Sequence, residues 1–421
     1  MKTNNVARQS FRPCPGGLIL ALAFLLSASA ALAEAGYAIV QKIQGTATYA
    51  SGIGEGALKS GQRLDEGTRI TTGNGSYVDL NLGDNGDALR IGEASVVTLT
   101  ELTVRKLRKS TVVRTEVNVT RGKVVANVIK KLNRSSRYRV KTPQWVAGIR
   151  GTCIEAGVAG LVAITGTVQF TQANGQVQMV IGGFAYSTGG NQPQQATAAQ
   201  TQGIAASATS STANLGNAAL VQATVQQFAQ AIASRAALNA PNAQAAATAA
   251  SQTAAAVVQA LTQAVLQEAQ NAPAEIRAQV QQAVQVIQQQ AAAITVTAAA
   301  AAAATATVAI VTGQGSTPQQ AEQQAEQAAQ QAADQAGQIA IEQAGQGNNQ
   351  AAAQATAQQV AQVKQEASNV AKSTITSVQR TLSAGGNASQ ALNSAVETTP
   401  TISVSPTGQT QVTPRPVAPG A

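Results

Sequence analysis

The sequence predicts an all-β sandwich or β-roll, followed by a region rich in alanine and glutamine that is α-helical or partly disordered. Three observations lead to this division. About a dozen short runs of β-branched and aromatic residues fill residues 37–187, many separated by Gly or Asn/Asp. Residues 191–421 contain one aromatic, Phe228, and are dominated by Ala and Gln, both good helix formers. The charge also changes there: residues 34–190 hold 19 Lys/Arg against 11 Asp/Glu, and residues 191–421 hold 6 against 8.

The composition argues against an enzyme. The 421 residues include no histidine, which removes the commonest general base and the commonest metal ligand. The two cysteines are Cys14 and Cys153, and Cys14 lies in a segment that we expect to be removed. We therefore expect no catalytic residues, no metal and no cofactor, and the remaining enzymatic alternative is one that uses Asp or Glu alone.

Residues 1–33 resemble a secretory signal peptide. An apolar run, GLILALAFLLSASA, follows three basic residues, Lys2, Arg8 and Arg12. The small residues of Ala31-Leu32-Ala33 fit a cleavage site, which predicts a mature chain that begins at Glu34 and is periplasmic or secreted. The alternative is an uncleaved helix that anchors the chain in the membrane.

Residues 34–190 form the predicted β domain. Val78, Leu80 and Leu82 alternate with polar residues, which indicates a strand with one buried face. Asn85-Gly86 then predicts a hairpin turn, because both residues tolerate a positive φ. The acidic loop around them does not fit calcium, since Ser95 stands where the calcium loop pattern requires an acid.

Residues 191–397 form the predicted Ala/Gln-rich region of low complexity. Clusters of Pro, Gly and Asn at 239–242, 271–275, 313–318, 345–349 and 383–387 divide it into helix-length pieces. Their apolar stripes are thin, as in Val221, Val225, Phe228 and Ile232, so we expect loosely packed helices that can self-associate, or a partly disordered tether.

Two segments of this half need separate predictions. Residues 294–312 are an uncharged run long enough to span a bilayer. Ala and Thr at its centre gain little from lipid, so a weak helix or β-prone stretch is favoured over a membrane span. Residues 398–421 are rich in Pro and Thr and are predicted to be a disordered, extended tail.

The segment RVKTPQWVAGIRGT, residues 139–152, is the most distinctive motif of the chain. Thr142-Pro143 is typical of a strand end, and Gly148 and Gly151 permit left-handed turns or close backbone approach. Arg150 is interpreted either as an anion ligand or as part of a buried bidentate pair that fixes two strands. Trp145 is expected in the core, and Cys153 is expected to be a buried thiol rather than a nucleophile.

This motif resembles the FecR domain family of bacterial envelope proteins. The residues that match are Thr142, Pro143, Gly148, Arg150, Gly151 and Thr152, with a weaker upstream match at Leu58, Gly61, Leu64, Gly67, Ile70 and Thr72. The resemblance covers about residues 38–170. It implies a compact all-β periplasmic or extracellular module for protein–protein signalling or ligand sensing, without catalytic residues. Founding members carry a cytoplasmic anti-sigma segment before a transmembrane helix. Only 17 residues precede Leu18, where the strongly apolar residues begin, so an exported protein of other purpose is favoured.

A basic band is the candidate recognition surface. Between Arg105 and Lys141 the chain has thirteen Lys/Arg and one acid, Glu116. The residues expected to bind a polyanion are Lys130, Lys131, Arg134, Arg137, Arg139 and Lys141. The expected partner is an envelope protein or an anionic polysaccharide. Nucleic acid is not expected, because the protein is exported and aromatic residues are not interleaved. The structural alternative is a solvated strand face.

These observations predict an exported, non-enzymatic protein that serves binding, sensing or assembly at the cell envelope. The alternative is a membrane-anchored signalling regulator whose N-terminal helix is not cleaved. A membrane contact is expected only in that alternative.

Overall fold

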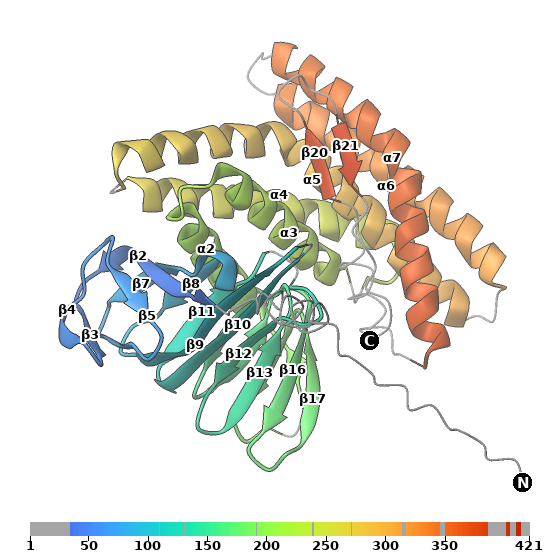
Figure 1. The fold of residues 1–421 in the computed structure, drawn as a ribbon. Coiled ribbons are helices and arrows are strands. Elements are labelled where there is room, and N and C mark those ends of the chain that lie inside the picture. The colour runs from blue at the N-terminus through green and yellow to red at the C-terminus, as the bar shows by residue number, and fades with distance from the viewer. Residues whose placement is uncertain are drawn as a thin grey trace, which may run out of the picture.

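The computed structural model describes residues 34–413, except for 109, 130–131, 191, 238–239, 271, 314–316, 346–349, 386–400 and 405–409. Two β-sheets are followed along the chain by a layer of helices (Figure 1). This arrangement confirms the predicted fold class, with a β region first and a helical region second. The predicted signal peptide, residues 1–33, lies outside the described residues.

The two sheets, called sheet A and sheet B below, are stacked as a sandwich. Sheet A has the order β17 (Val177–Ile181), β16 (Thr167–Gln172), β13 (Trp145–Ile149), β12 (Arg137–Lys141), β10 (Ser110–Arg121), β9 (Val96–Leu107), β6 (Arg69–Thr72), β3 (Ala47–Ser51) and β4 (Gly54–Ala57), and β1 (Glu34–Ala35) pairs with β9. Sheet B has the order β19 (Gln194–Gln195), β18 (Phe184–Ser187), β15 (Gly160–Ala163), β14 (Cys153–Gly157), β11 (Lys123–Asn127), β8 (Ala88–Ile91), β7 (Tyr77–Asn81), β2 (Tyr37–Gln44) and β5 (Arg63–Asp65). The chain passes between the sheets several times, and β10 and β12 consequently pair in parallel.

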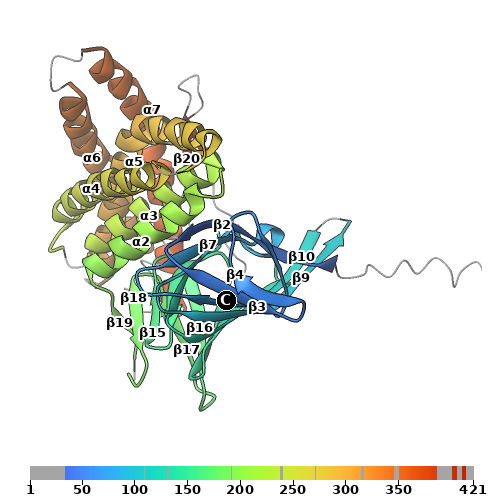
Figure 2. The same cartoon turned by 90° about the vertical axis from the view of Figure 1, so that its left-hand side faces the viewer.

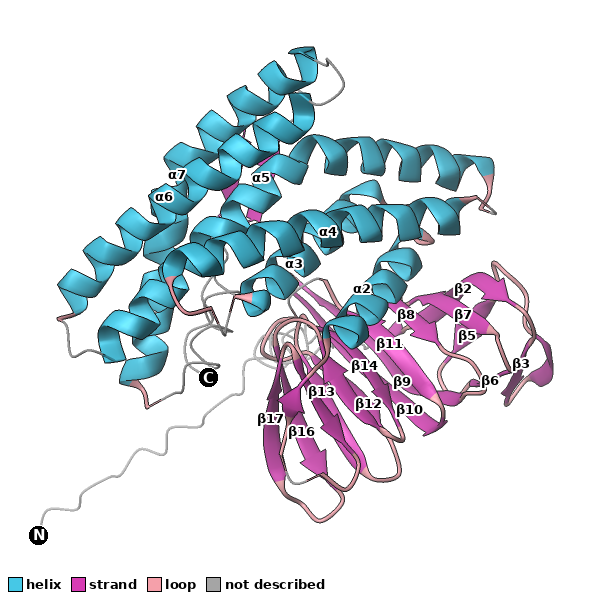
Figure 3. Cartoon of the chain, turned by 180° about the vertical axis from the view of Figure 1, so that it is seen from behind, coloured by secondary structure: helices cyan, strands magenta, loops and turns pink. Residues whose placement is uncertain are grey.

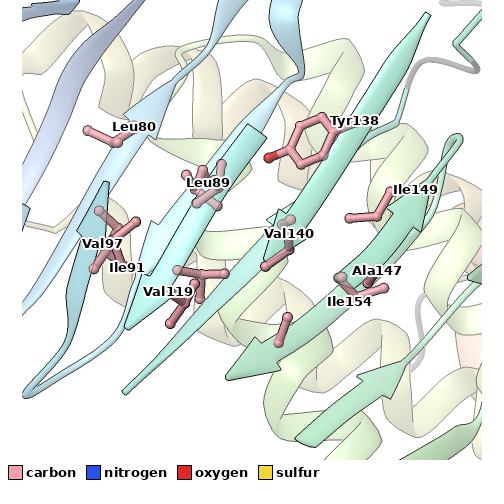
Figure 4. Close-up of a cluster of buried hydrophobic side chains, with 14 of the residues drawn as sticks. Leu80, Leu89, Ile91, Val97, Val119, Tyr138, Val140, Ala147, Ile149 and Ile154 are labelled. Atoms are coloured by element: carbon pink, nitrogen blue, oxygen red, sulfur yellow. The ribbon is translucent and has the colours of Figure 1, made fainter. Parts of the chain in front are cut away.

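The core of the sandwich comes from the inward face of each strand. Alternate residues of strands in both sheets are buried, and Figure 4 shows Leu80, Leu89 and Ile91 of sheet B packed with Val119, Val140 and other residues of sheet A. Trp145 and Phe170 lie 5.2 Å apart between ring centroids, and Phe170 and Tyr186 lie 4.3 Å apart. The core position expected for Trp145 is therefore correct.

The hairpin expected around Asn85-Gly86 is present, but its turn differs from the prediction. β7 and β8 pair on either side of a short 3₁₀ helix, η1 (Gly83–Asn85). Asn85 is buried and does not take a positive φ, whereas Gly86 has φ 146°. The Asn85 amide instead donates to the carbonyl oxygens of Thr103 and Arg114, so it joins the loop to β9 and β10.

The helices are α2 (Ala198–Ala213), α3 (Ala218–Ala236), α4 (Ala243–Ala269), α5 (Ala274–Gly313), α6 (Pro318–Gly345) and α7 (Gln350–Ser383). Their breaks from α3 onward fall at the predicted Pro/Gly/Asn clusters. Asn242 shows the cause, because its side chain caps α4 by accepting from the Ala245 amide at 2.8 Å. The break between α2 and α3 was not predicted, and there Asn217 caps α3.

The helical layer is packed more closely than its thin stripes suggest. The stripe residues of α3 are buried, and Val221, Val225 and Phe228 join a cluster that also contains Val125, Cys153 and Ile164 of the sandwich. Figure 3 shows α2 lying over β8, β11 and β14 of sheet B. The stripes therefore find their apolar partner in the outer face of sheet B.

Residues 294–312 lie within α5 and are helical, in agreement with the weak-helix alternative. By length and composition, Ala274–Val311 could cross a bilayer, but 83% of its most apolar window is buried inside the protein. Alanines of α5 pack against α6 and α7, which form the far side of the helical layer (Figure 1).

Within residues 398–421, β20 (Thr401–Val404) and β21 (Thr410–Thr413) pair as an antiparallel ribbon. This pairing differs from the predicted disordered tail, and β-branched residues in both segments favour it.

Candidate functional site

The motif of residues 139–152 forms a turn, one strand and a crossover between the sheets. At its start the Thr142 hydroxyl accepts from the amides of Gln144 (3.3 Å) and Trp145 (3.2 Å), which closes a tight turn around Pro143. The chain then forms β13 of sheet A and passes into β14 of sheet B. The Thr142-Pro143 pair and the Gly151-Thr152 pair consequently lie beyond opposite ends of β13, a strand of 5 residues and so about 16 Å long at roughly 3.3 Å per residue.

The two motif glycines differ in their roles. Gly151 has φ 97°, a conformation that favours glycine, at the crossover. Gly148 has an ordinary φ, and a Cβ there would lie 3.8 Å from the Gln169 carbonyl oxygen, which is normal contact. The left-handed turn or close approach expected at Gly148 is therefore absent. Thr152 is buried, and its carbonyl oxygen accepts from the Val128 amide at 3.1 Å.

Arg150 does not form the buried bidentate pair that we considered. Its side chain is exposed, and its guanidinium donates to the Arg134 carbonyl oxygen at 3.4 Å. Ile149 before it and Ile154 after it are in the core, as expected. Cys153 is also buried, and burial together with the nearby Glu155 charge raises the pKa of its thiol. A buried neutral thiol of this kind is a poor nucleophile.

The outer face of sheet A is open and basic. In Figure 1, β9, β10, β12 and β13 face the viewer with no helix in front of them. Arg137, Arg139 and Lys141 alternate along β12 and point outward, because Tyr138 and Val140 between them are buried. Arg114 on β10 lies beside Arg137, and Lys141 lies beside Asn118. Lys130 and Lys131 of the predicted polyanion site lie outside the described residues.

Two acids neutralise part of this face. Glu116 of β10 pairs with Arg139 at 2.5 Å, and Glu101 of β9 pairs with Arg137 at 3.4 Å. Within the described part of the chain, Arg114 and Lys141 form no ion pair and are exposed. The structure therefore brings Arg114, Arg137, Arg139 and Lys141 of the band together on one face, where Arg114 and Lys141 are the cations most available to an incoming anion. Lys123 of the band instead lies on β11 of sheet B and pairs with Glu155.

An amide-lined cleft of about 680 Å³ adjoins this face. It lies where β16, β17 and β18 meet, and its lining includes Gln172, Asn174, Gln176 and Val177. Gln172 donates to the Tyr186 hydroxyl at 2.7 Å. The Ala173 amide donates to the Gln144 carbonyl oxygen at 2.8 Å, so the cleft lies beside the Thr-Pro turn. Its neutral amides can exchange hydrogen bonds with hydroxyl or amide groups of a ligand.

The outer face of sheet B carries a buried cluster of charged and polar residues beneath the helices. Arg90 of β8 makes a bidentate pair with Asp79 of β7, at 2.6 and 2.7 Å. Asn214, which ends α2, donates to Asp79 at 2.7 Å and to Glu268 of α4 at 3.2 Å. Glu268 also accepts from Tyr77 at 2.8 Å and pairs with Lys42 of β2. We call these six residues the interlayer cluster.

Neighbouring groups within the interlayer cluster set the protonation of Glu268 and Tyr77. Burial alone would raise the pKa of the Glu268 carboxyl, but hydrogen bonds from Lys42, Tyr77 and Asn214 and the charge of Arg90 hold it below its ordinary value. Burial and the adjacent Glu268 raise the pKa of Tyr77, so its phenol remains a hydrogen-bond donor. The Arg90 guanidinium lies 4.2 Å from the Tyr77 ring centroid, a cation–π distance.

Two further polar contacts join the helices to the sandwich. Asn127 of β11 donates to the Thr212 hydroxyl at 2.9 Å, and Arg235 of α3 donates to the Ile164 carbonyl oxygen at 2.7 Å. Sequence reasoning missed these contacts and the interlayer cluster. It treated Asp79 as a residue of a polar outer face, yet Asp79 is fully buried. One signal was available in the sequence. Lys42, Asp79 and Arg90 are charged residues within predicted strands, and Glu268 is the only acid of the α4 segment, so a contact between the two groups could have been considered.

Comparison with known proteins agrees with the motif. The FecR protein family matches residues 68–178, which include β9 to β13 and the whole Thr-Pro to Gly-Thr segment. The chain carries a FecR domain. The match confirms the resemblance and places it within the sandwich, whereas the helical layer lies outside the matched residues. No protein of curated function matches the sequence.

Two solved structures are similar to part of this chain. Both are crystal structures of a protein from Parabacteroides distasonis described as a "putative anti-sigma factor". They are 13% and 14% identical to this chain, with TM-scores of 0.24 and 0.23. Each alignment covers 31% of this chain and 59% of the other, so the chain spans less than two thirds of those proteins.

Among the described residues, no group of three or more His, Cys, Asp or Glu side chains could hold a metal ion.

Proposed function

We propose that this protein is an exported, non-enzymatic FecR-domain protein that binds an anionic polysaccharide of the cell envelope. One observation carries the proposal: the helices occupy the outer face of sheet B, while no described helix covers the basic outer face of sheet A. A sheet face that the described part of its own chain does not cover is available to a partner. The charge of this face selects an anionic one.

The amide-lined cleft supports a saccharide. It adjoins the open face at Val177 of β17 and offers uncharged hydrogen-bonding groups, with β13 and β16 between it and the cations of β12. Hydroxyl groups of a sugar match such amides, and its carboxylates or sulfates match Arg114 and Lys141. The two features together suit a polymer that carries both hydroxyl groups and charge.

A binding experiment tests this proposal. The chain from Glu34 onward is measured against immobilised polygalacturonate, with neutral dextran as the reference. We expect binding that weakens as salt rises, because screening shortens the reach of exposed charges to about 8 Å near physiological ionic strength. Arg114→Gln/Lys141→Gln should weaken binding roughly fivefold, at about 0.5 kcal/mol for each exposed charge.

The control removes two exposed charges elsewhere. Lys372→Gln/Arg380→Gln changes the net charge equally but lies on α7, in the helical layer. Equal loss of affinity in both double variants would show non-specific attraction by net charge and would contradict the proposal. Equal binding to polygalacturonate and dextran would also contradict it.

A second candidate is a membrane-anchored signalling regulator with an uncleaved N-terminal helix. The FecR domain favours it, since the family resemblance implies signalling or sensing at the envelope. Mass mapping of the native N-terminus in membrane and soluble fractions distinguishes the two. A soluble chain that starts at Glu34 supports the first candidate, and an intact leader in the membrane supports the second.

A further inference from the structure

The hairpin of β9 and β10 ends in an exposed basic tip with a leucine in it. Leu107 is opposite Ser110 at the last described pair of the ladder, and 41% of its surface is exposed. Arg105, Lys106 and Arg108 around it are exposed as well, and Lys109 follows in the sequence. Figure 2 shows this hairpin projecting from the sandwich on the side away from the helices.

Other cations lie at the same end of sheet A. β12 begins there with Arg137, next to Arg114 of β10, and β13 ends there with Ile149. Arg150 follows β13 and contacts the Arg134 carbonyl oxygen. The acids near them are few: Glu101 pairs with Arg137, and Glu34 lies 4.0 Å from Lys106. This end of the sandwich is therefore positively charged, with one large apolar side chain at its projecting point.

The chain enters the fold at this end. Glu34 pairs with Val104 of β9, three residues before Leu107 and so about 10 Å from it along the strand. The 33 residues that precede Glu34 include the predicted apolar leader. Residues 1–33 are therefore attached at Glu34, on the strand beside the basic tip.

We propose that the β9–β10 tip docks on the surface of an anionic phospholipid bilayer. Leu107 enters the boundary between headgroups and acyl chains, and Arg105, Lys106 and Arg108 contact lipid phosphates. An exposed leucine among cations gains little from a hydrated polymer, but it gains free energy when it leaves water for the bilayer boundary. This docking uses residues other than the saccharide-binding row and does not depend on it.

Vesicle flotation tests the docking with the chain from Glu34 onward, which holds every described element and lacks the leader. We compare two kinds of vesicle. One contains phosphatidylcholine with about 30 mol% phosphatidylglycerol, roughly one anionic lipid in three, and the other contains phosphatidylcholine alone. We expect flotation with the anionic vesicles alone. Arg105→Gln/Lys106→Gln/Arg108→Gln should weaken binding roughly a hundredfold, at about fivefold for each charge, and Leu107→Asp about tenfold.

Matched variants separate docking from general effects. Ile339→Asp replaces a residue of α6 with a similar exposure, 44%, and Lys364→Gln/Lys372→Gln/Arg380→Gln removes three charges from α7. Both controls should float like the parent chain. Absence of flotation, or equal loss in the tip and control variants, would refute the proposal.

A fluorescent label gives an independent reading. In the chain from Glu34 the remaining cysteine, Cys153, is buried, so Leu107→Cys provides an accessible thiol for an environment-sensitive dye. Anionic vesicles should shift the dye emission to the blue at position 107 and leave it unchanged in an Ile339→Cys chain. A blue shift without vesicles that grows with protein concentration would instead show self-association through the tip and would overturn the proposal.

Discussion

Replacing Glu268 with alanine should lower the free energy of unfolding, because it removes the polar contacts that hold the helical layer on the sandwich. The carboxylate accepts from Lys42, Tyr77 and Asn214 and lies 3.7 Å from Arg90. Truncating one partner of a buried ion pair costs about 3–5 kcal/mol. The side chains of Glu268 and Lys42 are 12% and 17% exposed, so we expect the lower limit, about 3 kcal/mol.

Thermal and chemical unfolding measure this loss. An unfolding entropy of about 2.1 cal/mol/K per residue, taken over the roughly 350 described residues, converts 3 kcal/mol into a melting-temperature decrease of about 4 °C. Hydrogen exchange should increase most in α2 and α4, because the helices lose their polar contact with sheet B. Glu268→Gln should lose less, since it keeps acceptors for Tyr77 and Asn214.

Glu342→Ala is the control, because Glu342 is exposed on α6 and forms no ion pair within the described residues. A loss below 1 kcal/mol for Glu268→Ala, or one equal to that of Glu342→Ala, would refute the reasoning. The pH dependence adds a second check. The pKa of Glu268 is depressed in the folded protein, so its stabilisation is present above the unfolded pKa, about 4.3, and is lost as pH falls through the folded value. The difference in stability between the parent chain and Glu268→Gln should therefore shrink in acid.

Three other variants and one labelling experiment test further parts of the structure. Arg150→Gln should change the free energy of unfolding by less than about 0.5 kcal/mol, since the side chain is exposed; a larger loss in urea unfolding would revive the buried pair. Trp145→Ala should cost about 3–5 kcal/mol by emptying the core beside Phe170, and retention of the parent urea midpoint would contradict this. Gly183→Ala should destabilise the chain, because φ is 82° and a Cβ would collide with Arg235; an unchanged melting temperature would disprove that contact. The Cys153 thiol should react with a disulfide reagent only after unfolding. The absorbance of the released chromophore, measured in native buffer and in denaturant, follows this reaction.

The sequence predicted those parts of the fold that depend on local patterns. Runs of β-branched residues indicated the strands, and the Pro, Gly and Asn clusters indicated helix breaks, as at residues 239–242, where Asn242 caps α4. The turn at Asn85-Gly86 escaped the prediction because Asn85 is held by Thr103 and Arg114, which are distant in sequence. A turn residue that bonds two other strands no longer follows the local preference for a positive φ.

The candidate site was predicted in part for a similar reason. Arg137, Arg139 and Lys141 alternate with buried residues along β12, so strand geometry directs all three side chains to the same face. The same rule predicted that Asp79 is exposed, but Asp79 is buried because α2 and α4 cover that face of sheet B. Whether a polar face meets water or another layer depends on elements more than a hundred residues away, and periodicity within one strand carries no information about them.

The interlayer cluster also sets an order of events during synthesis. Asp79 lies 135 residues before its partner Asn214, and Lys42 lies 226 residues before Glu268. At about 5–20 residues per second, Lys42 leaves the ribosome roughly 10–45 seconds before Glu268 follows it. Until Glu268 emerges, Lys42 has no partner from the helical layer, and the outer face of sheet B lacks the cover of α4. The interlayer cluster is therefore completed only after every strand of the sandwich has been synthesised.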